Sequence, residues 1–218
     1  MSGTIALLPV KQLSESKSRL APILSDTKRK NLAIAMLKNT LLVLENARNK
    51  GLLQEIIVVS HDHQVLKLAE LARAVPLEET ITANTGSHLN AALSAANTYA
   101  VTRFDPQRLL VLPGDLPLLK TDTLEKFLYL HANVELLIAG DRFLDGTNAL
   151  LLCPPFLLDN VFYYGPGSFK KFQEVAKKAG HCFSVYHEPI LATDLDTPAD
   201  FNYIRQNFPE VLAILQKL

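Results

Sequence analysis

Short apolar runs alternate along this chain with longer segments in which apolar residues return every three or four positions. Within the short runs the apolar residues are nearly continuous, which is typical of strands buried on both faces of a sheet. The pattern therefore predicts strands at residues 5–10, 55–60, 108–112, 135–139, 148–152 and 182–186.

The longer segments have the periodicity of helices that pack through one face. The clearest spans residues 26–50, with Ser25 as its predicted N-cap and Gly51 directly beyond its end. Thr197 and Pro198 open another helix, as N-cap and first helical residue, and a break is predicted at Phe208-Pro209. The remaining helices are predicted at residues 63–73, 87–102, 121–130 and 169–179.

The alternation of strand and helix predicts an α/β fold, a single-domain Rossmann-like doubly wound sheet that is mostly parallel and spans residues 1–218. A chain of 218 residues with 48% apolar side chains can bury one substantial core. In such sheets, ligands bind beyond the carboxyl ends of the strands. The loops after Val10, Leu112, Leu152 and Tyr186 are therefore the places to search for chemistry.

Charge and composition narrow the function. The 22 basic residues balance the 22 acidic ones, so no net field attracts nucleic acid or an anionic membrane. The apolar N-terminal stretch lacks the basic flank and cleavage site of a secretory signal. The apolar stretch at 149–158 contains two prolines and is too short to span a membrane. The two cysteines, Cys153 and Cys182, fit a reducing compartment. We expect a cytoplasmic protein.

Three cations follow the first predicted strand. Lys11 comes directly after Pro9 and Val10, and Lys17 and Arg19 lie a few residues further on. Such a cluster could hold a triphosphate, and the guanidinium could do so through two hydrogen bonds. The loop has neither a Walker glycine pattern nor the dinucleotide fingerprint. On charge alone, a solvated loop with no ligand remains the alternative.

Carboxylates occur in two further loops. Asp115 stands at the end of a strand between Pro113-Gly114 and Pro117, a setting that suits either a metal ligand or a helix cap. Asp194 and Asp196 would point to the same side of an extended segment. Two close carboxylates repel each other unless a cation or a proton is shared. Support of the cap at Thr197 would explain Asp196 and leave Asp194 unexplained.

Two glycine-containing loops complete the set of candidate sites. Tyr164-Gly165-Pro166-Gly167-Ser168 places two glycines before a helix, where free backbone N–H groups suit an anion. An ordinary Gly-Pro turn with Ser168 as helix cap is the alternative. The second loop is Asp145-Gly146-Thr147-Asn148. The histidines have no zinc-binding spacing, and no nucleophile elbow is present.

Taken together and in order, these segments resemble the guanylyltransferases of deazaflavin cofactor biosynthesis, which transfer GMP to 2-phospholactate, phosphoenolpyruvate or 3-phosphoglycerate. The resemblance extends from about Ile5 to Phe201, and its most specific parts are the Lys-Ser-Arg-Leu and Gly-Thr-Asn-Ala-Leu segments. The matching residues are Leu8-Pro9-Val10-Lys11, Ser16-Lys17-Ser18-Arg19-Leu20, Asp115-Leu116-Pro117-Leu118-Leu119, Gly146-Thr147-Asn148-Ala149-Leu150, Gly165 with Ser168-Phe169, and Asp194-Leu195-Asp196-Thr197-Pro198.

The resemblance implies a fold of the nucleotide-diphospho-sugar transferase type, related to molybdenum-cofactor guanylyltransferases. It implies that Mg²⁺ is bound by Asp115 together with Asp194, Asp196 or both, and that the acceptor acid contacts Thr147, Gly165 and Ser168. The implied nucleotide-binding residues are Pro9, Lys11, Lys17, Arg19 and Asp115, of which Lys17, Arg19 and Asp115 act in catalysis. The sequence departs from the family at Gly114, where alanine is more usual, and at 141–146, which is bulkier than the expected glycine-rich run.

The resemblance implies a reaction between GTP and a small phosphorylated acid. A phosphate monoester is largely a dianion at neutral pH and needs no strong base to act as a nucleophile. Mg²⁺ would neutralise charge at the α-phosphate while Lys11, Lys17 and Arg19 stabilise the departing pyrophosphate. The alternatives are a nucleotidyltransferase for a sugar phosphate or the molybdenum cofactor, and a non-catalytic regulatory protein that binds nucleotides. Homodimerisation is left open.

Overall fold

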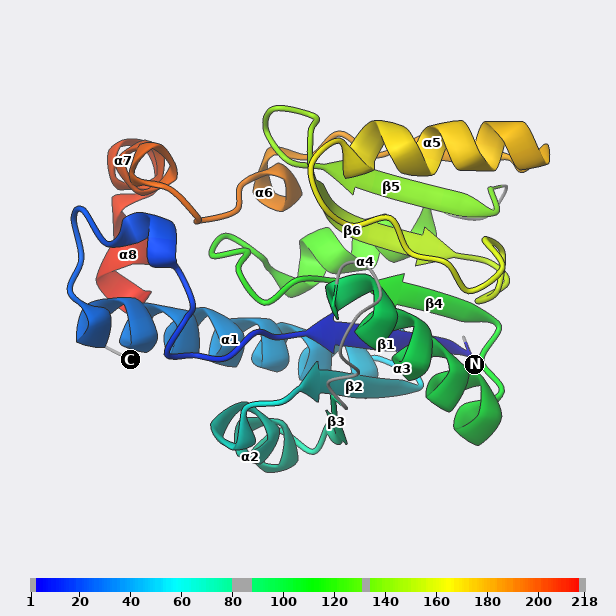
Figure 1. The fold of residues 1–218 in the computed structure, drawn as a ribbon, viewed down its shortest axis with the longest axis horizontal. Helices are drawn as coiled ribbons and strands as arrows, with labels where there is room; N and C mark the ends of the chain where they lie inside the picture. Colours follow the sequence, from blue (N-terminus) through cyan, green and yellow to red (C-terminus); the bar gives the residue numbers. More distant parts are fainter. Residues whose placement is uncertain (1–2, 80–87, 131–133, 216–218) are drawn as a thin grey trace.

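The computed structural model describes residues 3–79, 88–130 and 134–215. Seven strands form one sheet with the order β3-β2-β1-β4-β6-β5-β7, which Figure 1 shows with helices packed around it. No helix in the described ranges is long and apolar enough to cross a membrane. The strands are β1 (Thr4–Pro9), β2 (Glu55–Ser60), β3 (Val75–Glu78), β4 (Arg108–Val111), β5 (Leu136–Gly140), β6 (Thr147–Leu152) and β7 (Phe183–Val185).

The sheet is mostly parallel, as predicted. The pairs β1–β2, β1–β4, β2–β3 and β5–β7 are parallel, whereas β6 runs antiparallel to both β4 and β5. A short hairpin, residues 141–146, joins β5 to β6, and a parallel crossover would need a much longer connection. The carboxyl ends of β1, β2, β3 and β4 therefore share one edge, and the amino end of β6 meets them there.

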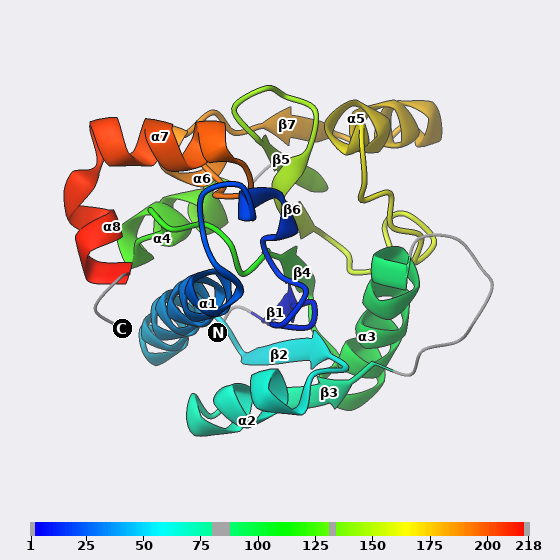
Figure 2. The same ribbon diagram turned by 60° about the vertical axis from the view of Figure 1, so that its left-hand side comes forward.

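Successive strand residues point to opposite faces of the sheet and enter two separate cores. Ala6 and Leu8 pack with α1 (Asp26–Asn49), α2 (His63–Leu71) and α4 (Thr121–Tyr129). Ile5 and Leu7 pack on the other face with α3 (His88–Phe104) and α5 (Ser168–Ala179). Figure 2 separates α1 and α3 on opposite sides of the strands. Burial on both faces explains the continuous apolar runs.

A third core joins two loops of the candidate site. Leu20, which follows the basic loop, and Leu195, which lies between Asp194 and Asp196, are both fully buried in one cluster with Met36 of α1. The cluster also holds residues of α7 (Pro198–Asn207) and α8 (Pro209–Leu215). This packing brings the carboxylate loop near the C-terminus against the loop after β1.

The helix caps predicted at Ser25, Gly51 and Thr197 are confirmed. The Ser25 side chain accepts a hydrogen bond from the Lys28 amide at 3.4 Å, and Gly51 has a φ of 75° just after α1. Thr197 caps α7 with Pro198 in its first turn. A new helix begins at Pro209, after the predicted break. These ends depend on local chain chemistry, and the sequence alone is sufficient to place them.

Three elements were not predicted, and several boundaries differ. One of the three is a short 3-10 helix, Ser18–Leu20, in the loop after β1. Strand β3 is a short edge strand containing Pro76, and proline is tolerated at an edge but weakens the sequence pattern. The single-turn helix α6 (Pro189–Ala192) also escaped prediction. Helix α5 begins at Ser168, one residue before the predicted start, and α3 is described from His88, so the predicted start at Ser87 lies outside the described residues.

Candidate active site

The loop after β1 is held to the edge of the sheet by backbone contacts. The Val10 amide donates to the Val59 carbonyl at 2.9 Å, and the Leu13 amide donates to the Asp62 carboxylate at 2.8 Å. Leu13 is buried in the core beneath the loop. Lys17 then adopts a left-handed conformation with a φ of 58°, which is uncommon for a residue with a side chain. The anchored loop carries Lys17 back over the strand ends.

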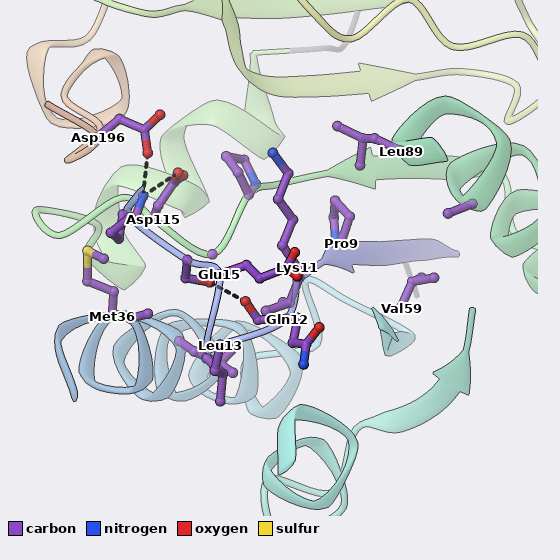
Figure 3. Close-up of a pocket in the computed structure, with 18 of the residues that line it drawn as sticks. Pro9, Lys11, Gln12, Leu13, Glu15, Met36, Val59, Leu89, Asp115 and Asp196 are labelled. Carbon is purple, nitrogen blue, oxygen red and sulfur yellow. Dashed lines mark hydrogen bonds and ion pairs between the residues drawn. The ribbon is translucent and has the colours of Figure 1, made fainter. Parts of the chain in front are cut away.

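Lys17 lies between two carboxylates from distant parts of the chain. Its Nζ atom donates to Asp115 at 2.8 Å and to Asp196 at 2.9 Å, and its side chain is only 7% exposed. Figure 3 shows both contacts at one end of the cleft. Arg19 Nη1 lies 3.6 Å from Asp196, but the Arg19 side chain is 74% exposed and free to reach a ligand. The structure thus brings together Lys17, Arg19, Asp115 and Asp196, four of the residues that the sequence indicated as candidates.

Electrostatics stabilise this cluster in its charged form. Burial disfavours the Lys17 ammonium, but the charges and hydrogen bonds of Asp115 and Asp196 outweigh it, so the pKa of Lys17 lies above its ordinary value. Burial also opposes ionisation of Asp196, and the Lys17 ammonium, with help from Arg19 and Lys11, nevertheless holds the Asp196 pKa below its usual range. Lys17 is therefore a cation, and Asp196 an anion, at neutral pH.

Asp194 has the opposite environment. Burial, followed by the negative charges of Asp115, Asp200 and Asp196, raises the pKa of Asp194 to about 7. Asp194 and Asp196 are expected to repel each other, and two effects reduce this repulsion. A neighbouring cation stabilises the charge of Asp196, and the raised pKa of Asp194 favours its protonated, neutral form.

The carboxylates of Asp115 and Asp196 could supply two ligands to Mg²⁺, but not a complete set of protein ligands. Within residues 3–79, 88–130 and 134–215, no three His, Cys, Asp or Glu side chains are grouped so that they could hold an ion. Mg²⁺ is commonly held by one or two carboxylates together with phosphate oxygens of the substrate. Asp115 and Asp196, which converge on a single ammonium, supply such a pair. Their oxygen donors fit Mg²⁺ if a nucleotide completes its coordination.

A cleft of about 780 Å³ opens beside this cluster. Pro9 and Lys11 line it near the end of β1, and Thr147 lines it at the start of β6. Figure 3 shows the Lys11 side chain extending away from α1. The cleft is therefore bordered both by the predicted nucleotide residues and by Thr147, which was predicted to contact the acceptor.

Thr147 and Ser168 form a buried pair. Their hydroxyl oxygens are 3.1 Å apart, and the two residues are 7% and 1% exposed. One hydroxyl donates to the other, which leaves one O–H hydrogen available to a ligand. Both predicted hydroxyls thus lie together, although of the two only Thr147 borders the cleft.

The free amides predicted before α5 are not free. The Gly167 amide donates to the Asp145 carboxylate at 3.2 Å, the Ser168 amide to the Gly165 carbonyl, and the Phe169 amide to the Asp145 carbonyl. The prediction of an anion site made by these N–H groups is wrong, because Asp145 already occupies the helix N-terminus. Ser168 as a cap is also wrong, since it is the first helical residue and Gly167 precedes it.

Gly165 lies apart from the cleft lining. Its φ of 138° favours glycine, and a Cβ added there would meet nothing within 4 Å. Tyr164, the preceding residue, does border the cleft. The predicted contact between Gly165 and an acceptor therefore stays a prediction.

Two residues that position the loop carrying Asp194 and Asp196 were not predicted from the sequence. One carboxylate oxygen of Asp200 accepts hydrogen bonds from the Asp196 amide at 3.2 Å and from the Thr197 amide at 2.8 Å. Its other oxygen accepts from Arg142, whose guanidinium also lies 4.1 Å from the centre of the Tyr203 ring. The Thr-x-x-Asp spacing of a capping box could have indicated Asp200. No local pattern indicated Arg142.

The arrangement of strands and helices is that of the nucleotidyltransferases. A crystal structure described as a nucleotide-diphospho-sugar transferase, from Desulfovibrio desulfuricans, superimposes with a TM-score of 0.73 at 16% identity and covers 100% of this chain and 95% of its own. 4-Diphosphocytidyl-2C-methyl-D-erythritol synthase from Anaerococcus prevotii gives a TM-score of 0.62 at 11% identity, covering 95% and 96%. At these identities the likeness establishes the fold.

Sequence comparison identifies the family. The chain belongs to the CofC-like guanylyl transferases, whose family model matches residues 4–205. It is 36% identical over 199 residues to phosphoenolpyruvate guanylyltransferase of Rubrobacter xylanophilus, covering 91% of each chain, and 33% identical over 206 residues to that of Sphaerobacter thermophilus, covering 94% of each. It is also 31% identical to 2-phospho-L-lactate guanylyltransferase of Methanocaldococcus jannaschii, covering 91% of this chain and 80% of that protein. The resemblance inferred from the sequence is confirmed, and the protein is a nucleotidyltransferase of the guanylyltransferase type.

Proposed function

We propose that this protein transfers GMP from GTP to the phosphate of a phosphorylated three-carbon acid, with phosphoenolpyruvate as the first candidate, in deazaflavin cofactor biosynthesis in the cytoplasm. The observation that carries the proposal is the cleft itself. It is bordered by Lys17, Asp115 and Asp196 at one place and by Thr147 of the buried hydroxyl pair at another. A triphosphate and a small acid could therefore occupy one continuous space.

The reaction forms one phosphorus–oxygen bond and breaks another. An oxygen of the acceptor phosphate attacks the α-phosphorus of GTP, the bond from that phosphorus to the bridging oxygen of the β-phosphate breaks, and pyrophosphate leaves with the electron pair. The acceptor phosphate is already largely a dianion, so no side chain needs to remove a proton. This agrees with the cluster of cations and carboxylates that Lys17, Arg19, Asp115 and Asp196 form at the cleft.

The basic and acidic side chains of the cleft have different proposed roles. Lys11 and Arg19 can hold the β- and γ-phosphates, where negative charge accumulates as pyrophosphate departs. Asp115 and Asp196 would hold Mg²⁺, which would neutralise the α-phosphate and orient it toward the acceptor. Asp200 keeps the Asp196 backbone in place through the hydrogen bond to its amide.

Phosphoenolpyruvate is the first acceptor to test because the relatives named for it include those with 36% and 33% identity. 2-Phospho-L-lactate is the second, after the relative at 31% identity. Both acids carry a phosphate beside a carboxylate, so the remaining hydroxyl hydrogen of the Thr147–Ser168 pair suits either as a donor. 3-Phosphoglycerate completes the panel.

The proposal is tested by measuring pyrophosphate release from GTP, ATP, CTP and UTP with each of the three acids in the presence of MgCl₂. We expect release with GTP and phosphoenolpyruvate, and a product that contains GMP joined to the acid through a phosphoanhydride. The Asp115→Asn variant should be inactive. The matched control is Asp122→Asn in α4, because the Asp122 side chain is 86% exposed and pairs with Lys50 outside the cleft lining. Absence of release with every acid would refute the proposal.

A further inference from the structure

The cleft extends beyond the Lys17 cluster toward the carboxyl ends of β2 and β3. His61 follows the last residue of β2, Glu79 follows β3, and both border the cleft. The Glu79 amide donates to the Ser60 carbonyl at 2.9 Å, which continues the pairing of the two parallel strands. The backbone that carries Glu79 is therefore held in register with β2 at the edge of the cleft.

The cleft is apolar between its charged regions. Pro9, Val59 and Val111 line it from the ends of β1, β2 and β4, and Leu89 and Ala92 line it from the first turns of α3. Figure 3 places Val59 and Leu89 on either side of Pro9. A lining of this kind suits a flat aromatic ring, because it removes the faces of the ring from water.

Glu79 offers an acceptor without a matching donor in the part of the chain that the structure describes. Its side chain is only 18% exposed, and its carboxylate lies 3.6 Å from His61 Nδ1, beyond hydrogen-bond distance. His61 Nδ1 is itself buried and has no hydrogen-bond partner among the described residues. Placing a carboxylate partly out of water in an apolar cleft costs free energy unless a ligand supplies hydrogen-bond donors to it.

The position of Glu79 fits the span of a nucleotide. In the strand order β3-β2-β1-β4, the loop carrying Asp115 and the loop carrying Glu79 are three strand spacings apart, or about 14 Å. A nucleoside triphosphate with its α-phosphate near Asp115 and its sugar over β1 would direct its base toward β2 and β3.

We propose that Glu79 selects guanine by accepting hydrogen bonds from its N1–H and 2-amino groups. The inference rests on the proposed function, since it assigns the base of the GTP that the reaction consumes. A carboxylate only accepts hydrogen bonds. Guanine presents two adjacent donors on this edge, whereas adenine and cytosine each present a ring-nitrogen acceptor that the carboxylate repels. His61 borders the same pocket and limits where the Glu79 carboxylate can lie.

Calorimetric titration of GTP, ITP and ATP into the full chain with MgCl₂ tests this assignment without turnover. ITP retains the N1–H group of guanine and lacks its 2-amino group. The variants are Glu79→Gln, which keeps the shape and removes the charge, and Glu79→Asp, which keeps the charge on a shorter side chain. The matched control is Glu78→Gln, an exposed residue at the end of the same strand.

We expect the wild type and Glu78→Gln to bind GTP roughly 10- to 100-fold more tightly than ITP or ATP, as charge-assisted hydrogen bonds predict. Glu79→Gln should lose most of its GTP affinity and bind ATP as well as the wild type does, while Glu79→Asp should keep a preference for GTP. Equal loss of all three nucleotides, or unchanged GTP affinity in Glu79→Gln, would overturn the assignment. If GTP binds selectively through Glu79 but no acid yields pyrophosphate, the proposed reaction fails and the base assignment stands.

Discussion

Lys17→Met removes the cation between Asp115 and Asp196 and leaves their carboxylates facing each other. The ammonium is hydrogen-bonded to both, at 2.8 and 2.9 Å, and its side chain is 7% exposed. Methionine preserves the length and apolar stem of lysine. The variant therefore tests the charge more than the packing of the stem.

The expected loss follows from the burial of the three groups. Removing one partner of a fully buried ion pair costs about 3–5 kcal/mol. The carboxylates of Asp115 and Asp196 are 28% and 39% exposed, so water screens part of their repulsion. We expect a loss of about 2 kcal/mol in the free energy of unfolding. For a chain of 218 residues this corresponds to a fall in Tm of about 4–8 °C.

A divalent cation should reverse the loss. If Mg²⁺ binds the same two carboxylates, it competes with Lys17 in the wild type and meets no competitor in the variant. Calorimetry with and without MgCl₂, at ionic strength matched with NaCl, should therefore show a larger rise in Tm for Lys17→Met than for the wild type. Lys170→Met, at an exposed position of α5, controls for the loss of one lysine. If Lys17→Met is as stable as the wild type, or gains no more from MgCl₂, the reasoning is refuted.

Four further predictions concern the candidate active site. Asp115→Asn should lower turnover by at least roughly 100-fold at saturating MgCl₂, because losing a metal ligand removes several kcal/mol of transition-state stabilisation; near-normal pyrophosphate release would contradict the metal assignment. Arg19→Ala should weaken GTP binding roughly 10-fold and leave acceptor binding unchanged, since this exposed guanidinium is free to contact phosphate. Unchanged GTP affinity would show that Arg19 is a solvated residue that does not contact the nucleotide. Gly165→Val should weaken acceptor binding while GTP still binds. The φ of Gly165 is 138°, so valine there should also add about 1–3 kcal/mol of backbone strain, measured as a lower Tm. Ser168→Ala should cost only about 1 kcal/mol of acceptor binding, roughly five-fold. Loss of GTP binding with acid binding intact in the Gly165 variant would reverse the assignment of the two substrates.

The sequence was most informative where chemistry is local to a loop. Lys17, Arg19, Asp115 and Asp196 were identified as candidates because charged residues gather in the loops that follow predicted strands, and the structure brings all four together. The sequence was least informative about backbone amides, because whether they are free to bind a ligand depends on hydrogen-bond acceptors elsewhere in the chain. The amides before α5 were predicted to be free, and the Asp145 carboxylate that occupies one of them comes from another loop.

Sequence by itself determined the apolar runs that become strands, the helical periodicity, and the helix ends at Ser25, Gly51 and Thr197. Each of these depends on residues within one or two turns of the chain. Only the tertiary structure decided that β6 runs antiparallel between β4 and β5, and that Lys17 lies against carboxylates 98 and 179 residues away. The pairing of distant segments depends on the order of strands in the sheet and on burial of Leu20 and Leu195 in one core. The local periodicity of the sequence indicates neither the strand order nor this shared core, because the periodicity is the same whichever neighbours a strand or loop has in the fold.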